Sequence, residues 1–306
     1  GLVGSEMCIR DRYSVDLLAA INGSPTQGFG YTTLMTNNGK MVNRGVEITL
    51  SGEIIRQKDF SWNASLLYAF NRNKVKHISV QPSLWDSRIS MPTSYPMVGK
   101  PLYGIYAYKW AGLNENGDPQ VYDAENNVTS GPARDYHALV YCGTTVPIHN
   151  ASLTNVLRYK GFEFSAMLIL DAGHKLRSSN IPSINMSNGR ITSTAKGIVD
   201  RWTQPGDVTD VPRLLFSNDT ENFNTHRTEL YRYSDLFVYD ASNIRLSNIS
   251  LAYRVPAHWC KKISLSGARL QFNVENVATF AFDSKANYDL DGKVKPNYVW
   301  GLYLNF

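Results

Sequence analysis

The last ten residues of the chain, NYVWGLYLNF (297–306), alternate strictly between large apolar side chains and mostly small or polar ones. Successive side chains of a β-strand point to opposite faces, so this segment presents one wholly apolar, largely aromatic face. That face consists of Tyr298, Trp300, Leu302, Leu304 and Phe306. A strand between lipid and a wet lumen has this pattern, but so does a strand of a soluble sheet. The choice depends on the rest of the chain.

The same period of two recurs in four further segments: Val46–Ile54, Ser61–Phe70, Phe162–Asp171 and Ala268–Glu275. The first of them is expected to place Val46, Ile48, Leu50 and Ile54 on its apolar face. Strands of about 9 to 11 residues with one apolar face, one polar face and aromatic residues near the ends are typical of outer-membrane β-barrels. A large soluble antiparallel sandwich has the same period and stays open as an alternative at this point.

The connections between these segments are short at one end and long at the other. Residues 56–59 and 160–161 form the short ones, and a modest link with Pro256 joins the strands that end and begin near Arg254 and Gly267. The long ones cover about residues 71–150, 172–241 and 277–296. Short turns on one rim and long loops on the other are typical of bacterial outer-membrane barrels. We therefore predict an all-β fold, a transmembrane antiparallel β-barrel with long extracellular loops.

Composition agrees with a barrel and argues against several other classes. The chain has 306 residues with 18 Tyr, 12 Phe and 6 Trp, and it has no run of 18 uncharged apolar residues that would form a membrane-spanning helix. The net charge of +5 comes from scattered Lys and Arg residues, so no nucleic-acid partner is expected. Cys8, Cys142 and Cys260 lie too far apart to indicate a disulfide framework or a zinc site.

The sequence carries no motif that indicates an enzyme. The six His residues are isolated, and HExxH, GxSxG and Walker motifs are absent, so we expect no catalytic residue, no cofactor and no metal site. The segment NYDLDG (287–292) has the opening spacing of a calcium loop. However, Tyr298 stands where such a loop needs a bidentate Glu. We interpret this segment as a polar loop before the last strand.

The first twelve residues, GLVGSEMCIRDR, have neither the sections of a signal peptide nor a strand period. They resemble a translated sequencing-adapter read of the kind found at the ends of metagenomic contigs. We interpret residues 1–12 as a sequencing artefact and expect the natural amino-terminal part of the protein to be missing.

Segments that carry a family resemblance are spread over the rest of the chain: NNGKMVNRGVEITL (37–50), DFSWNASLLYAFNRNKV (59–75), YAYKWAGLNENGDPQVY (106–122), LTNVLRYKGFEFSAMLI (153–169), RWTQPGDVTDVPRL (201–214), DASNIRLSNISLAYRVP (240–256), LQFNVENVATF (270–280) and YVWGLYLNF (298–306). In this order they resemble the carboxy-terminal barrel portion of the SusC/RagA family of TonB-linked outer-membrane proteins. Residues 13–306 are accordingly identified as the carboxy-terminal part of a TonB-dependent receptor β-barrel.

The resemblance implies a barrel of about 22 strands with an amino-terminal plug, of which only about eight strands fall within this chain. It implies a Gram-negative outer-membrane location and import of nutrients, with oligosaccharides as the first expectation and peptides as the second. The implied partners are a SusD-like surface lipoprotein, TonB through the missing amino-terminal part, the outer-membrane assembly machinery and the lipid bilayer. Transport therefore belongs to the parent protein.

The resemblance assigns roles to regions of the chain better than to single residues. Trp85, Trp110 and Trp202 lie in long loops, where indole rings can stack on the apolar faces of sugars. Alternatively, they pack the loops against each other or against the lipoprotein. The stretch from Arg201 to Arg213 is expected to form a folded loop fixed by ion pairs. The apolar face that ends at Phe306 resembles the signal read by the assembly machinery, or else it is only the last lipid-facing strand.

Two other functions stay open. A passive porin or structural barrel is the first, and a plug domain encoded upstream of Tyr13 would exclude it. A secreted soluble carbohydrate-binding sandwich is the second, although its outward apolar faces would then meet water.

Overall fold

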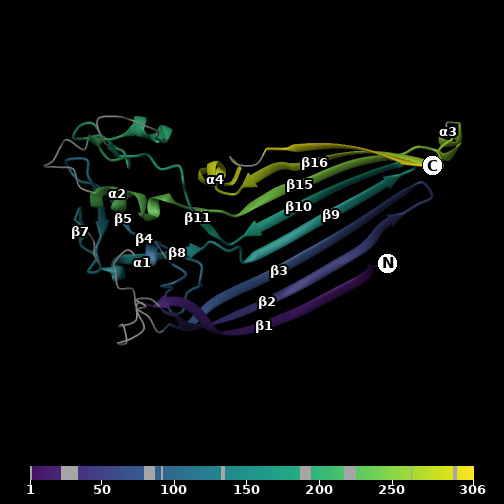
Figure 1. Cartoon of the computed structure of the whole chain (residues 1–306). Helices are drawn as coiled ribbons and strands as arrows, with labels where there is room; N and C mark the ends of the chain where they lie inside the picture. The colour runs from purple at the N-terminus through teal and green to yellow at the C-terminus, as the bar shows by residue number, and fades with distance from the viewer. Residues whose placement is uncertain are drawn as a thin grey trace.

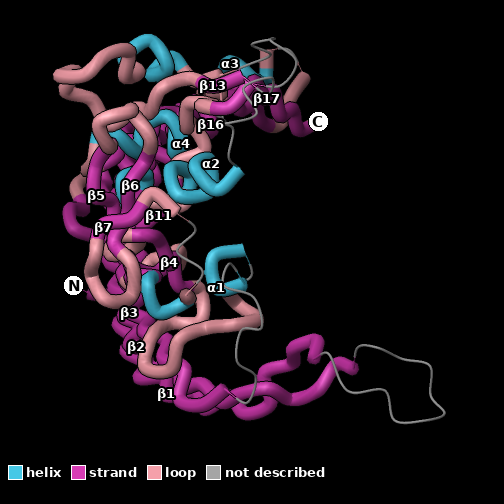
Figure 2. The backbone as a smooth tube through the Cα atoms, turned by 90° about the vertical axis from the view of Figure 1, so that its left-hand side faces the viewer, coloured by secondary structure: helices cyan, strands magenta, loops and turns pink. Residues whose placement is uncertain are grey.

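The computed structural model describes residues 2–21, 34–78, 87–90, 92–131, 135–186, 194–216, 225–262, 264–291 and 295–306. Its largest element is one eight-stranded sheet in the order β1-β2-β3-β9-β10-β15-β16-β17, with every neighbouring pair antiparallel (Figure 1). The strands are β1 Leu2–Ile21, β2 Leu34–Arg56, β3 Phe60–Ile78, β9 His149–Tyr159, β10 Phe162–Ala172, β15 Asn243–Arg254, β16 Gly267–Ala281 and β17 Asn297–Asn305. Seen from the loop end, this sheet is an arc with β1 and β17 at its edges (Figure 2).

The predicted short connections are confirmed. Residues 57–59 join β2 to β3, and Lys160 and Gly161 alone join β9 to β10. A Cβ atom on Gly161 would lie 2.8 Å from the backbone oxygen of Arg254, so only glycine lets the end of β15 approach this turn. The link between β15 and β16 contains the short helix α3, Ala257–Lys261.

One face of the arc is apolar from β3 to β17, because the register aligns apolar residues of neighbouring strands. Phe272 and Trp300 are cross-strand partners with ring centroids 4.2 Å apart. Two rows of partners show the continuity: Leu302, Leu270, Tyr253, Phe162, Tyr159 and Phe60, then Trp300, Phe272, Leu251, Phe164, Leu157 and Trp62. Such cross-strand pairs are the unit of sheet stabilisation.

The apolar face is the convex one. The loop that follows β3 folds over the polar face, where the backbone N–H of Leu102 donates to Asn73 Oδ1 at 2.7 Å. Helices α1 (Ser87–Ser90) and α2 (Thr225–Arg232) also lie on the inner side of the arc (Figure 2). The outer side therefore carries the apolar rows, with Trp300 exposed to 78%.

Bulges keep the alternation in phase with the two faces. In β15 the convex residues on one side of the bulge at Ser247 have odd numbers: Ile249, Leu251 and Tyr253. On the other side of the bulge the convex residues have even numbers: Ile244 and Leu246. One extra residue reverses the phase and so returns apolar side chains to the convex face.

The same effect corrects one prediction. Ile54 was expected to share a face with Val46, Ile48 and Leu50, but the register shifts between Glu53 and Ile55. Ile55 is therefore the residue opposite Trp62. Strict alternation in sequence predicted the wrong residue here because a bulge adds one position to one strand only.

The alternative of a soluble sandwich is wrong for the described part of the chain. A sandwich covers the apolar face of each sheet with a second sheet. Here the smaller sheets lie among the loops at one end of the strands, and the convex rows keep exposed aromatic and aliphatic side chains (Figure 1).

Two polar groups on the convex face have hydrogen-bond partners on the same face. Asn155 lies between apolar partners, and its Oδ1 accepts a hydrogen bond from Trp62 Nε1 at 3.1 Å. Nearer the loops, the Tyr68 hydroxyl and His149 Nδ1 are 2.8 Å apart. Polar groups facing lipid must find protein partners because no water is available, so this pairing fits a membrane-facing surface.

Strand lengths agree with the prediction in part. Strands β9, β10, β15 and β17 have 11, 11, 12 and 9 residues, close to what a membrane requires. Strands β2 and β3 have 23 and 19 residues, so their hairpin continues beyond the length that spans a bilayer. The loop after β3 therefore begins after Ile78 and not near Asn71.

The long connections fold into a layer of short elements at one end of the arc, called the loop layer here (Figure 1). β4 Gly104–Tyr108 pairs with β8 Leu139–Thr144, β11 Lys175–Arg177 pairs with β14 Val238–Asp240, and β12 Asn185–Met186 pairs with β13 Leu215–Phe216. A three-stranded sheet is formed by β5 Trp110–Leu113, β6 Pro119–Tyr122 and β7 Val128–Thr129. Single 3₁₀ turns lie at Tyr136–Ala138, Lys196–Asp200, Asp235–Phe237 and Ser284–Ala286, and α4 spans Asn287–Asp291.

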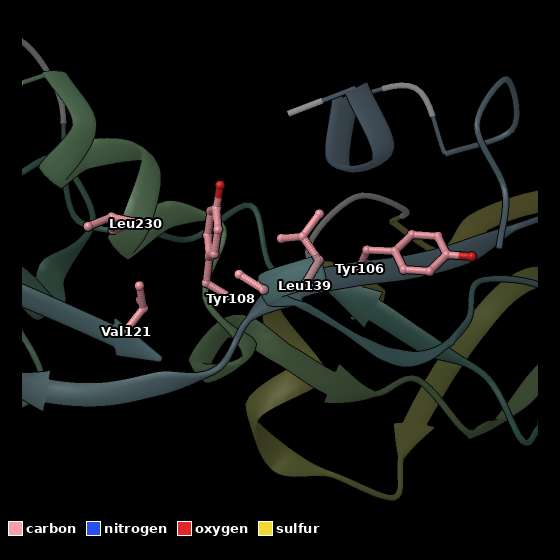
Figure 3. Close-up of a cluster of buried hydrophobic side chains, with 6 residues drawn as sticks. Tyr106, Tyr108, Val121, Leu139 and Leu230 are labelled. Atoms are coloured by element: carbon pink, nitrogen blue, oxygen red, sulfur yellow. The ribbon is translucent and has the colours of Figure 1, made fainter. Parts of the chain in front are cut away.

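The loop layer has its own hydrophobic core (Figure 3). The buried cluster consists of Tyr106, Tyr108, Val121, Ala138, Leu139 and Leu230. Every residue of β4 is buried, and the Tyr106 hydroxyl accepts a hydrogen bond from the N–H of Met97 at 3.0 Å. Burying a large apolar side chain contributes roughly 1.5–3 kcal/mol, so this cluster gives the long connections a fixed structure.

The backbone of β1 pairs with β2 from Leu2, opposite Gly52, to Ile21, opposite Leu34. The sequence of residues 1–12 was expected to have no strand period, yet these residues lie in a strand. Backbone pairing with an open sheet edge does not depend on side chains, so the interpretation of residues 1–12 as an artefact stays a prediction.

Among the described residues, no helix combines the length and apolar character needed to cross a bilayer.

The two faces predict unequal responses of stability to an added charge. Ile249 lies on the convex face between Ala166 and Val274, and Ser250 follows it on the concave face. We expect Ile249→Arg to lower the free energy of unfolding in lipid vesicles by about 2–4 kcal/mol, because it places a cation in the bilayer. The matched control Ser250→Arg should change it by about 0.5 kcal/mol or less. Equal losses in urea titrations would contradict the assignment of the faces.

Candidate functional site

The candidate functional site is the concave face of the arc together with the loop layer above it. Neighbouring strands place polar and charged side chains side by side on this face. A row toward the short turns contains Ser61, Arg158 and Glu163, and rows nearer the middle contain Asn63, Ser65, Thr154, Ser165, Ser250, Gln271 and Asn273. This face therefore suits contact with water and polar ligands.

Ion pairs order part of the concave face. Arg158 Nε lies 2.8 Å from Glu163 Oε2, and Arg269 Nη2 lies 3.2 Å from Glu163 Oε1. Nearer the loops, Arg245 Nη2 lies 2.8 Å from Asp171 Oδ2. Pairs that remain partly exposed contribute about 1 kcal/mol or less. Their main effect here is to fix the directions in which the guanidinium groups point.

A cavity of about 360 Å³ opens where the concave face meets the loop layer. Asn43, Asn71 and Asn73 contribute amide groups, and Glu47 and Tyr103 also line the cavity. The amide of Asn73 bonds both Asn43 and the backbone of Leu102, so its orientation is fixed. Ligand sites have volumes of roughly 300–1,000 Å³ and a few fixed polar groups. This cavity can therefore hold a small polar ligand.

The two longest connections are joined by a charge cluster that we call the Asp118 clamp. Arg213 donates to both oxygens of Asp118, at 3.0 and 2.8 Å, and Arg227 Nε donates to Asp118 Oδ1 at 3.1 Å. Asp118 comes from the connection after β3, whereas both arginines come from the connection after β10. Two-pronged arginine pairs fix geometry as well as distance. The clamp therefore holds the two connections in one arrangement.

Arg227 is the most buried member of the clamp, with 3% of its surface exposed. Its remaining N–H groups donate to the backbone oxygens of Ile184 and Arg213, and to Asn185 Oδ1. Burial lowers the pKa of Arg227 more than the charge of Asp118 raises it, so the pKa lies below its usual value. A buried guanidinium needs this many partners because an unpaired charge there is very costly.

Trp110 and Trp202 are both held by contacts inside the loop layer. Trp110 Nε1 donates to Asp210 Oδ1 at 2.9 Å, and its ring lies 5.9 Å from the ring of Tyr231. A Cβ atom at Gly117, where φ is +75°, would lie 2.4 Å from the Trp202 ring, so the ring packs directly on this glycine. These contacts agree with the alternative in which the indoles pack the loops together. Their role in binding substrate stays a prediction.

Trp85 lies outside the described residues. The folded stretch expected from Arg201 to Arg213 is present, since Thr203 donates to Asp207 and Arg213 pairs with Asp118. The hydrogen bonds from Thr203 lower the pKa of Asp207. The sequence did not indicate that Arg227 and Asp118 form an ion pair, because Asp118 lies in a segment that is typical of a turn. The only feature of the sequence that could have indicated this pair is the opposite charge of the two residues. Charges scattered along a chain do not show which residues come into contact.

A further ion pair lies where the loop layer leaves the sheet. Lys175 Nζ lies 3.0 Å from Asp240 Oδ2, and these residues are also cross-strand partners in the β11–β14 pair. Burial raises the pKa of Asp240, but hydrogen bonds from Ser242 and Lys175 outweigh burial and lower the pKa to about 2. Ser242 Oγ in turn accepts from the N–H of Gly173 at 3.0 Å. This pair ties both ends of the second long connection together.

The segment interpreted as a polar loop, residues 287–292, begins with the helical turn α4. Asp289 Oδ1 accepts hydrogen bonds from Ser179 N at 2.9 Å and from Ser179 Oγ at 2.6 Å. The carboxylate therefore joins the last connection to the one after β10. Within the described residues, no group of three or more His, Cys, Asp or Glu side chains is arranged to hold a metal ion.

The predicted apolar face of the last strand is at the edge of the sheet. Tyr298, Trp300, Leu302 and Leu304 pair with successive convex residues of β16, and Phe306 follows with 91% of its surface exposed. The structure therefore places Tyr298, Trp300, Leu302 and Leu304 on one face, available to lipid or to another strand. The position of Phe306 on that face stays a prediction.

No protein-family model matches the chain. The chain is similar to TonB-dependent receptor P3 of Formosa agariphila, with 25% identity over 294 residues that cover 89% of this chain and 28% of the relative. It is also similar to TonB-dependent receptor SusC of Bacteroides thetaiotaomicron, with 22% identity over 300 residues, covering 91% of this chain and 28% of SusC. The chain therefore spans less than a third of the length of these relatives.

Solved structures agree in fold. The chain superposes on the structure of the RagAB peptide transporter with a TM-score of 0.73 and 21% identity, covering 99% of this chain and 33% of that one. The RagAB peptide importer in its closed-closed state gives a TM-score of 0.72. The predicted resemblance to SusC/RagA proteins is confirmed, and so are the predicted fold, part of an outer-membrane β-barrel, and the predicted outer-membrane location.

The clamp predicts a local response to loss of one arginine. We expect Arg227→Ala to destabilise the loop layer by about 1.5–3 kcal/mol, because hydrogen bonds to a charged partner are lost. Hydrogen exchange of the β6 and α2 amides should then be about ten- to a hundredfold faster. Arg232→Ala, at the exposed end of the same helix, is the matched control. Equal exchange in both variants would show that the clamp does not hold the layer.

The Lys175–Asp240 pair predicts acid sensitivity. Its contribution is fully present above the unfolded pKa of Asp240, about 4, and is lost as the pH falls toward the folded pKa of about 2. We therefore expect the protein to unfold at higher urea concentration than Asp240→Asn at pH 6, and this difference to shrink between about pH 4 and 2. Tryptophan fluorescence during urea unfolding measures it. A difference that grew on acidification would contradict the prediction.

Proposed function

We propose that this chain is the carboxy-terminal barrel portion of a TonB-dependent outer-membrane importer of nutrients. One observation carries the proposal: an eight-stranded arc has an apolar convex face, a polar concave face and a folded loop layer at one end only. A lipid-facing wall, a wet lumen and extracellular loops need these three features. The similarity to TonB-dependent receptors supports the same function.

In this proposal the concave face is a wall of the transport route, and the convex face meets lipid. The upstream part of the parent protein supplies the plug and the segment that TonB contacts, so the energy for import comes from TonB. The chain performs no catalytic step and needs no cofactor.

A SusD-like lipoprotein is the proposed partner of the loop layer. Support comes from apolar side chains on the outside of that layer, where Val199 is exposed to 73% and Val208 fully. An apolar side chain is removed from water when a second protein covers it, so both residues suit contact with a partner.

We propose oligosaccharides as the transported nutrients and peptides as the second candidate. The amide-lined cavity at Asn43, Asn71 and Asn73 supports a ligand rich in hydroxyl or amide groups, because side-chain amides both donate and accept hydrogen bonds. Trp85, Trp110 and Trp202 remain the proposed aromatic contacts.

The proposal is tested by recovering the reading frame upstream of Tyr13 from the source DNA and then by deleting the intact gene. We expect the upstream frame to encode a plug domain and a TonB-contacting segment. Cells without the gene should lose growth on one glycan or peptide source, and blocking TonB should have the same effect. Uptake that continues without TonB would instead indicate a passive porin.

The terminal strand is also proposed to carry the assembly signal. We expect Phe306→Ala to reduce the amount of the protein in the outer membrane several-fold, because the signal ends on this exposed aromatic ring. Asn305→Ala, on the opposite face of the same strand, is the control. Quantitative blotting of membrane fractions measures the amounts, and equal amounts would leave the strand with a lipid-facing role only.

A further inference from the structure

Cationic side chains gather at the turn end of the concave face, far from the loop layer. A cavity of about 160 Å³ there is lined by Arg158, Lys160, Arg254 and Arg269 and by the carboxylate of Glu163. The side chains come from β9, the β9–β10 turn, β10, β15 and β16. The cavity therefore has four positive groups and one negative group.

Glu163 does not balance these charges. It accepts from Arg158 Nε at 2.8 Å and from Arg269 Nη2 at 3.2 Å, so both of its oxygens are used. One carboxylate neutralises one of the two guanidinium groups. Arg254 and Lys160 have no carboxylate partner among the ion pairs of the described residues.

The position of Arg254 makes the imbalance more pronounced. Arg254 is the direct cross-strand partner of Arg269 in the β15–β16 pair. Like charges in such positions are close together and destabilise a sheet. Arg254 is held in place because its backbone N–H donates to the oxygen of Gly161 at 2.8 Å, so the strand end cannot move away from the turn.

We infer that this cavity is an oxyanion site in which Arg254 and Arg269, with Lys160 beside them, hold a carboxylate or a phosphate group. Guanidinium groups bind these anions with two parallel hydrogen bonds. An anion between the two arginines turns a repulsive pair into two attractive contacts. The anion is either a carboxylate from another part of the protein inside the arc or a small free anion.

The test uses the protein that carries this chain, purified in a nonionic detergent, with inorganic phosphate as the probe. The variants are Arg254→Gln, which removes the charge, and Arg254→Lys, which keeps the charge but not the planar fork. Arg56→Gln is the matched control, because Arg56 lies on the same rim, is 82% exposed and is not part of the cavity. The midpoint of thermal unfolding is measured with phosphate and with chloride at equal ionic strength.

If the site takes a free anion, phosphate raises the midpoint of the unmodified protein and of Arg56→Gln by a few degrees, and Arg254→Gln loses this response. If the site holds a carboxylate of the protein, phosphate has no effect, and Arg254→Gln unfolds at a lower temperature than Arg254→Lys. The inference is overturned if phosphate has no effect and Arg254→Gln is as stable as the unmodified protein or more so. None of these readings depends on transport, so failure of the proposed function is a separate result.

Discussion

The structure depends on one constraint: a single sheet must keep two unlike faces apart from β2 to β17. Side chains alternate with a period of two, so a slip of one residue would move every apolar side chain of a strand to the wet face. The register prevents this by aligning Trp300, Phe272 and Leu251 across neighbouring strands. Where the sequence breaks phase, at Ser247 and Ile54, a bulge restores the alignment. The lumen wall and the lipid-facing surface both follow from this arrangement.

The loop layer is a second structural unit, built from connections that a barrel does not need for its own stability. Its core around Tyr108 and its clamp around Asp118 join segments about 100 residues apart in sequence. It is attached to the sheet at the polar face through Asn73 and at the strand ends through Lys175 and Asp240. A layer held at several points presents fixed surfaces, which suits recognition of a partner or a substrate.

The concave face changes in character along its length. Amide groups of Asn43, Asn71 and Asn73 line the end below the loops, whereas Arg158, Arg254 and Arg269 gather at the turn end. The ligand proposed for the amide-lined cavity and the anion proposed for the arginine cavity therefore lie at different depths of the same face. The field of such a face is local, because salt screens charges beyond roughly 8–10 Å.

The sequence by itself determined the fold class, the long strands from β2 to β17, the short turns and the face on which Tyr298, Trp300 and Leu302 lie, because a period of two is a local property. Only the tertiary structure decided that Asp118 meets Arg213 and Arg227, that Trp110 and Trp202 pack within the loops, and that Arg254 lies opposite Arg269. It also decided that Ile55 and not Ile54 faces Trp62. These contacts join residues distant in sequence or depend on bulges, and the alternation of one strand does not contain the register of its neighbour.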